Sequence, residues 1–314
     1  MIIVRTVLLS ILVMLGVGLL CWDYFNFDET PVAKPTKNLK REVQVSPWGL
    51  EAMGIDFSTS DSPMRTIKVA VLDSGIYQEH EDLKGKVVAE FNAIDPGEPV
   101  VDDLGHGTAI AGIIAANNNN IGVVGVARSV ELYDVKVLDK QGRGEPKNLV
   151  SAIEWCVSQG IDVINISFGY QAESLIIKKA IKDALDFGII IVASAGNTYG
   201  LNADFPAKYE NVFSITAVDQ ELLRVKTSAR GKIDFAAPGK EILSTDHEGG
   251  YSLFNGTSFA TAYATGFIAT LLQHSHKKLN HIELKNLLLE NAHVLDEEHL
   301  PSKEYGYGIL KLNN

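Results

Sequence analysis

From residue 68 onward, short apolar runs alternate with stretches in which apolar residues recur at helical spacing. Apolar runs of roughly four to eight residues favour buried strands, and recurrence at about every third or fourth residue favours helices. Strands that alternate with helices predict an α/β fold, a parallel sheet covered by helices on both faces. The expected strands are 68–72, 132–138, 163–167, 189–194 and 212–218, and the expected helices are 106–116, 146–159 and 174–187.

Residues with acid–base or nucleophilic chemistry stand at the ends of these elements. Asp73 directly follows the strand 68–72, and His106 opens the helix 106–116. Ser258 lies between a Gly-rich turn and an Ala-rich helical run, which is the place for a nucleophile at the start of a helix. A serine hydroxyl is a weak nucleophile at its ordinary pKa, so it needs a general base and an orienting carboxylate. The sequence supplies these groups in the order Asp, His, Ser.

Taken singly, each of these residues has a more common structural role. A serine at a helix start is usually a cap, and an aspartate after a strand is usually a turn residue. Together, the segments 69–76, 105–112 and 255–261 resemble the three active-site motifs of the subtilisin-like serine proteases, in their order along the chain. The resemblance extends from about Gln44 to about Leu310. It implies a doubly wound, mainly parallel sheet and a serine endopeptidase that acts on peptides or proteins.

The resemblance also assigns roles to residues. Ser258 would be the nucleophile, His106 the general base and then acid, and Asp73 the carboxylate that fixes the imidazole tautomer. Acyl transfer further needs hydrogen-bond donors aimed at the developing oxyanion. Asn197, just after the strand 189–194, matches the family's asparagine donor, with the backbone N–H of Ser258 as the second donor. A plain Gly-Asn turn is the structural alternative for Asn197.

Three positions depart from the family motifs. Ala109 replaces the second histidine of the motif around His106, and Phe259 and Ala262 replace the usual methionine and proline after Ser258. None of these positions supplies a catalytic group, and a missing proline relaxes a helical turn without removing chemistry. We therefore expect an active enzyme. A pseudoenzyme that binds peptides without cleaving them is the alternative.

The substrate is expected to lie as an added strand between two segments of the protein. By similarity, one segment is Gly142, Arg143 and Gly144, and the other is Ser167, Phe168 and Gly169. The residues Ser167 to Gly169 and Ser194 to Gly196 would form the walls of the first specificity pocket. The pocket floor would be Asp204, where many relatives have a small neutral residue, and the adjacent Phe205-Pro206 resembles the family's cis-proline turn. A carboxylate at the floor would favour Lys or Arg in the substrate. An Asp204 side chain that points to solvent is the alternative.

An asparagine-rich segment, 117–126, follows the helix that His106 opens and resembles the family's calcium loop. The resemblance implies ligands from the side chains or main-chain carbonyls of Gln44, Asp82, Asn117, Asn119, Ile121 and Val123. Hard oxygen donors of mixed type suit Ca²⁺, and bound calcium would stabilise the folded state by mass action. An asparagine-rich turn without metal is the alternative.

Residues 6–22 are almost wholly apolar, with Arg5 before them and acidic residues after them. This pattern favours an uncleaved membrane anchor, with the rest of the chain outside the cytoplasm, over a removed signal peptide. A lipoprotein signal at Cys21 is disfavoured because Leu20 is bulky. The predicted organisation is an anchor or signal at 1–23, a tether or short propeptide at 24–43 and a peptidase domain at 44–314.

Composition and motif content narrow the class and its partners. A net charge of −11 argues against nucleic acid, and two cysteines are too few for a disulfide framework. The sequence contains no H-E-x-x-H, which argues against a metalloprotease. We expect a monomer, membrane-anchored or secreted, with no further domain after the closing segment 305–310. The segment before Gln44 is too short for the large pro-domain of most secreted members, which favours a dedicated processing role over broad degradation.

Overall fold

Within the residues that the computed structural model describes, 43–56 and 63–313, nine strands form one sheet. Their order is β10-β11-β7-β6-β5-β4-β1-β3-β2, and β1 pairs in parallel with β3 on one side and β4 on the other. The strand order therefore switches at β1. The strands are β1 (Lys68–Asp73), β2 (Val87–Asn92), β3 (Glu131–Lys136), β4 (Val163–Ile166), β5 (Ile190–Ser194), β6 (Phe213–Val218), β7 (Phe235–Pro238), β10 (Ala292–His293) and β11 (Ile309–Leu310).

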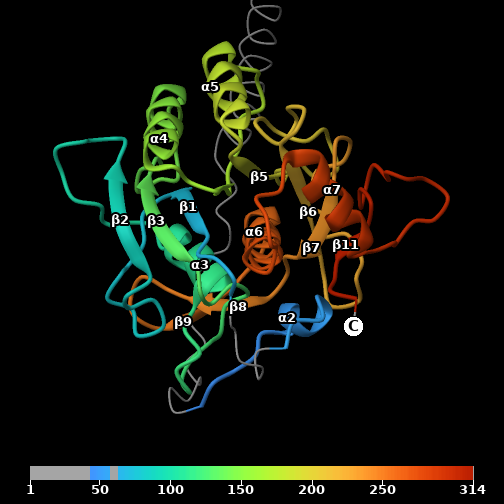
Figure 1. The fold of residues 1–314 in the computed structure, drawn as a ribbon, viewed down its shortest axis with the longest axis horizontal. Helices are drawn as coiled ribbons and strands as arrows, with labels where there is room; N and C mark the ends of the chain where they lie inside the picture. The colour runs from blue at the N-terminus through green and yellow to red at the C-terminus, as the bar shows by residue number, and fades with distance from the viewer. Residues whose placement is uncertain (1–42, 57–62, 314) are drawn as a thin grey trace, which may run out of the picture. The chain divides into compact units, whose positions relative to one another are not determined.

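Successive residues of a strand point to opposite faces of the sheet. Because the buried strands are apolar at successive positions, both faces are apolar and helices cover each of them. In β1, Val69 and Val71 pack in a core with α3, α6 and α7, whereas Ala70 and Leu72 pack in a core with α4 and α5. Figure 1 shows α4 and α5 next to each other, with α3 and α6 on the other side of the central strands. The helices are α2 (Trp48–Ala52), α3 (His106–Ala115), α4 (Pro146–Gln159), α5 (Leu175–Asp186), α6 (Thr257–Gln273) and α7 (His281–Glu290).

The central helix α6 is buried along nearly its whole length. Phe259, Tyr263 and Phe267 recur every fourth residue and pack in the core, while the small Gly266 admits the side chain of Val126. A helix that is apolar on all sides belongs in the interior. Its amino end follows the hairpin of β8 (Ile242–Thr245) and β9 (Tyr251–Phe254), which brings Ser258 to the sheet.

The predicted α/β architecture is confirmed. Each expected strand and helix is present, with ends that differ from the expected ones by at most two residues. The prediction omitted the strands β2, β7, β8 and β9, the short strands β10 and β11, and the helices α2 and α7. Strand β2 is only half-buried, and β10 and β11 have two residues each. These three strands therefore lack an apolar run long enough to predict a buried strand, and they are defined by their pairing partners.

The predicted anchor or signal, 1–23, and the tether, 24–43, lie almost wholly outside the described residues. In the part of the chain that is described, no helix is both long and apolar enough to cross a membrane. Cys156 on α4 is buried and has a free thiol.

The burial of α6 predicts a large cost for truncating its core side chains. Phe267 is 1 % exposed, so Phe267→Ala should lower the free energy of unfolding, measured in urea, by about 3–5 kcal/mol. Leu175 on α5 is 78 % exposed, and Leu175→Ala should change it by less than about 0.5 kcal/mol. Equal effects of the two substitutions would contradict the central placement of α6.

Candidate active site

The carboxyl end of β1 and the first turn of α3 bring Asp73 and His106 into contact. Nδ1 of His106 lies 2.8 Å from Oδ1 of Asp73, which also accepts the N–H of Ser74 at 2.8 Å. The two backbones approach closely because Gly107 has no Cβ; a Cβ there would overlap the carbonyl oxygen of Gly75. Asp73 is fully buried, and its Oδ2 accepts no hydrogen bond from the residues described.

The surroundings of His106 set its proton affinity. Burial lowers the pKa of the imidazole, but the charge and hydrogen bond of Asp73, with a further contribution from the charge of Asp102, raise it overall above its ordinary value. The side chain is 16 % exposed and packs against the ring of Phe259, with centroids 5.4 Å apart. An imidazole in these surroundings can take and return a proton near neutral pH.

Ser258 occupies the second position of α6 and is 9 % exposed. The first N–H groups of a helix have no intrahelical acceptor, so the N–H of Ser258 is available to a ligand. Its hydroxyl donates to the carbonyl oxygen of Ser167 at 2.6 Å, and the hydroxyl of Ser167 donates to the carbonyl oxygen of Ser258 at 3.2 Å. In the described part of the chain, the Ser258 hydroxyl thus bonds to Ser167 and not to His106.

Asn197 lies just beyond β5, against the turn that precedes Ser258. Its Oδ1 accepts the N–H and the hydroxyl of Thr257, at 3.2 and 3.3 Å. These contacts leave Nδ2 as the donor of the amide, and Nδ2 lies beside Gly256. Because Gly256 has a φ of 135° and no side chain, the amide stays uncovered on this side.

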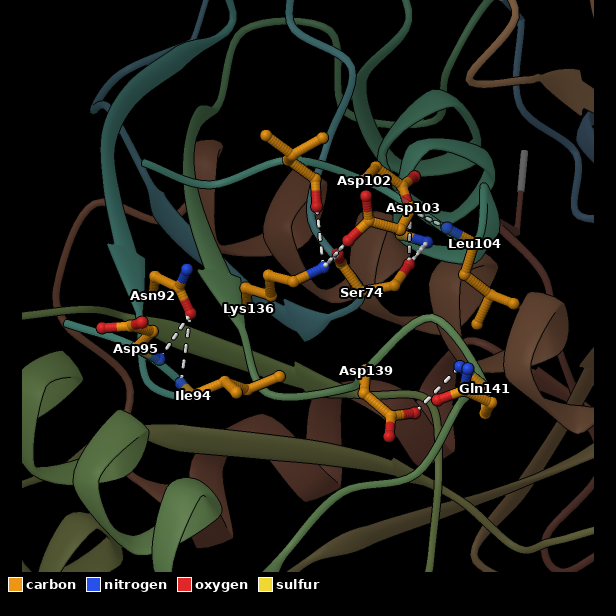
Figure 2. A network of polar contacts seen from close by, with 12 residues as sticks. Ser74, Asn92, Ile94, Asp95, Asp102, Asp103, Leu104, Lys136, Asp139 and Gln141 are labelled. Carbon is orange, nitrogen blue, oxygen red and sulfur yellow. Dashed lines mark hydrogen bonds and ion pairs between the residues drawn. The ribbon is translucent and has the colours of Figure 1, made fainter. Parts of the chain in front are cut away.

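Sequence reasoning missed a buried polar network behind Asp73 and His106 (Figure 2). Asp102 accepts the hydroxyl of Ser74 at 2.7 Å, and Lys136 donates to the carbonyl oxygen of Ser74, also at 2.7 Å. An aspartate shortly before a helix is a capping signal, and it could have pointed to Asp102. The sequence holds no comparable signal for Lys136, which lies within β3.

The side chain of Asp204 is packed between two glycines. A Cβ at either Gly169 or Gly196 would overlap it, so the predicted pocket walls enclose this carboxyl group. Burial raises the pKa of Asp204 to about 6, against a lowering effect of the Lys208 charge. The peptide bond that follows Phe205 is cis, as the sequence motif predicts.

The two predicted cleft segments are neighbours. A Cβ at Gly144 would lie 3.4 Å from the ring of Phe168, so the segments 142–144 and 167–169 adjoin. The Arg143 side chain folds back onto Asp139, with Nε–Oδ2 and Nη2–Oδ2 distances of 3.0 and 2.8 Å. The N–H of Arg143 also donates to Oδ1 of Asp139 at 2.9 Å, and its carbonyl oxygen accepts the N–H of Asp139 at 3.0 Å. Ser194, at the end of β5, is buried.

One cluster contains all six residues predicted to bind calcium: Gln44, Asp82, Asn117, Asn119, Ile121 and Val123. Three carbonyl oxygens, of Asn117, Ile121 and Val123, converge on Nε2 of Gln44 at 3.2, 2.7 and 2.8 Å. An amide nitrogen has two hydrogens, so three oxygens around it fit an oxygen-coordinated cation better. The described residues include no group of three His, Cys, Asp or Glu suited to a metal, so such a site would depend on carbonyl and amide oxygens.

The chain resembles known proteases over most of its length. The model of the subtilase family matches residues 64–308. Subtilisin BL of Lederbergia lenta is 37% identical over 270 residues, which are 85% of this chain and 97% of that protein. Alkaline elastase YaB of Bacillus sp. (strain YaB) is 36% identical over 271 residues, 85% of this chain and 69% of that protein. The chain therefore belongs to the subtilase family of serine endopeptidases.

Proposed function

We propose that this chain hydrolyses peptide bonds with Ser258 as nucleophile, His106 as general base and then acid, and Asp73 as the orienting carboxylate. The observation that carries the proposal is the 2.8 Å contact between Asp73 and His106 beside the start of α6. A carboxylate on Nδ1 selects the tautomer in which Nε2 accepts the serine proton. The presence of Asn197 next to Ser258 disfavours the pseudoenzyme alternative.

The reaction would begin when the carbonyl oxygen of Ser167 exchanges the Ser258 hydroxyl for a substrate N–H as its hydrogen-bond donor. Its carbonyl oxygen, which accepts the Ser258 hydroxyl in the free protein, is also the group that a substrate strand along 167–169 would use. A peptide N–H that takes this acceptor frees the hydroxyl to turn toward His106. We expect substrate binding itself to complete the nucleophile–base contact.

The chemical steps then follow from the positions of the groups. The Ser258 oxygen attacks the peptide carbonyl carbon while its proton passes to His106, and Nδ2 of Asn197 and the N–H of Ser258 stabilise the oxyanion. The C–N bond breaks as His106 gives the proton to the leaving amine. Water then attacks the acyl-enzyme by the same route and regenerates the free serine.

We also propose that Asp204 selects Lys or Arg before the cleaved bond. The support is its packing between Gly169 and Gly196, the glycines of the two predicted pocket walls. A carboxylate that has already lost part of its hydration gains from a guanidinium or ammonium group through charge-assisted hydrogen bonds.

We propose a calcium ion at the cluster around Gln44, where three carbonyl oxygens converge. Asp82, which is fully buried, would provide the negative charge, and Asn119 a further oxygen. The ion would supply structural cohesion between the start of the domain and the loop after α3, and it would take no part in the chemistry.

The cellular setting is a further proposal. We infer that the peptidase domain, 44–314, works as a monomer outside the cytoplasm, attached through residues 6–22 or secreted. The support is Arg5 before the apolar run and acidic residues after it. Processing of one dedicated protein is the narrower candidate, and a few discrete cuts in casein, in place of rapid broad degradation, would favour it.

The triad and oxyanion assignments predict two distinct losses. Ser258→Ala should reduce peptide cleavage to background, whereas Asn197→Leu should lower kcat by about 10²–10³-fold with little change in KM. Steady-state kinetics on a peptide amide measures both. Cleavage that survives in Ser258→Ala would identify another nucleophile, and a folded parent protein that binds peptides without cutting them would be a pseudoenzyme.

The pocket assignment predicts a pH-dependent preference. Above a pKa of about 6 the Asp204 carboxyl is charged, so kcat/KM for Arg relative to Leu before the cut should rise as pH increases through 6. The ratio cancels the titration of His106, which both substrates need. Asp204→Asn should abolish the rise and most of the preference. A ratio that is flat between pH 5 and 8, or that favours Leu throughout, would remove Asp204 from the pocket.

The calcium assignment predicts a stability change. Calcium at about one hundred times its Kd should stabilise the folded protein by about 2.7 kcal/mol, and so raise Tm by several degrees over a sample in EGTA. The variant Asp82→Asn should lose this response, and magnesium should not reproduce it. The same Tm with calcium and with EGTA would show that the oxygens hold no ion.

A further inference from the structure

Asp102 is a buried carboxylate outside the proposed triad. It precedes α3, is 7 % exposed and accepts five hydrogen bonds, several of which Figure 2 displays. The donors are the hydroxyl of Ser74, the N–H groups of Leu104 and Gly105, and the N–H and hydroxyl of Thr108, at 2.5 to 3.1 Å. Gly105, the N-cap residue, has no side chain, so Asp102 caps α3 in its place.

The same network fastens α3 to β1. The hydroxyl of Ser74 donates to Oδ1 of Asp102 at 2.7 Å and accepts the N–H of Gly107 at 3.0 Å. His106 stands directly before Gly107, and Asp73 directly before Ser74. The backbone next to His106 and the backbone next to Asp73 are therefore linked through the Ser74 hydroxyl, which Asp102 orients.

Five other ionisable groups lie near this network. They are Asp73, Asp103, Asp134, Lys136 and His247. Lys136 pairs with Asp103 at 3.2 Å, which balances its charge. Burial raises the pKa of Asp134 well above its usual range. The ring of His247 lies against Gly105.

We propose that Asp102 is a second positioning carboxylate of this active site. It holds the start of α3 so that His106 faces Asp73, and its charge stabilises the imidazolium that forms when His106 takes the Ser258 proton. The inference rests on the proposed triad. Asp102 would act through His106, because among the residues that the structure describes it bonds to Ser74 and to residues at the start of α3. The pKa of His106, lowered by burial and raised mainly by Asp73, is raised further by Asp102.

The test compares the pH dependence of kcat/KM in the full chain for Asp102→Asn and Thr108→Val, with a substrate that has Leu before the cut. Asp102→Asn removes the charge, so the acid limb should move to lower pH by at least about half a unit, with a lower kcat. Thr108→Val removes one donor to Asp102, together with the acceptor of the Tyr77 N–H, and keeps the charge, so the limb should move slightly to higher pH. Thr108→Ser restores the donor and should restore the parent profile.

Each outcome bears on the proposal. A folded Asp102→Asn whose acid limb stays in place, or moves upward, would overturn it. If Asp102→Asn does not fold, Thr108→Val decides, and a profile identical to that of the parent would overturn the proposal. Ser258→Ala separates the two levels: if that variant still cleaves, the triad itself fails, whereas its inactivity together with an unmoved Asp102→Asn profile defeats this inference alone.

Discussion

The close approach of two backbones, at the end of β1 and the start of α3, is the constraint on which this site depends. The glycine at 107 lets the first helical turn pass against the Gly75 carbonyl, and this places Nδ1 of His106 at 2.8 Å from Asp73. The strand order switches at β1, so the carboxyl ends of β1, β4 and β5 share the edge at which the amino ends of α3 and α6 arrive. Asp73 thus lies at the end of β1, and His106 and Ser258 lie in the first turns of α3 and α6, whereas Asn197 lies in the loop beyond β5.

The two buried carboxylates near His106 differ in the hydrogen bonds that they accept. Asp102 is saturated with donors that the fold fixes in place, whereas Oδ2 of Asp73 accepts no hydrogen bond from the described residues. The imidazole therefore becomes the main partner of Asp73. In a water-poor site, fixed donors and charges act more strongly than they would in solvent, so one displaced donor changes the proton affinity of His106.

The local sequence predicted the central strands and the residues that stand at their ends. The alternation of apolar runs and helical patterns defined the central strands, and Asp73, His106 and Ser258 stood at element ends where a parallel sheet gathers them. The strands β10 and β11 have two residues each and are defined by their pairing with each other, so the local pattern of apolar residues did not predict them. The role of Asp102 depends on Ser74 and Thr108, whose approach is a tertiary event. The bond from Ser258 to Ser167, between α6 and the end of β4, was missed for the same reason.

Labelling with a fluorophosphonate, which reacts with an activated serine, tests whether Ser258 is the nucleophile. After reaction of the folded full chain, digestion and mass spectrometry locate the modified residue. We expect one modified residue, Ser258, with a labelling rate that rises with pH as His106 loses its proton. Modification at another residue, or an unmodified Ser258 in protein shown to be folded, would contradict it.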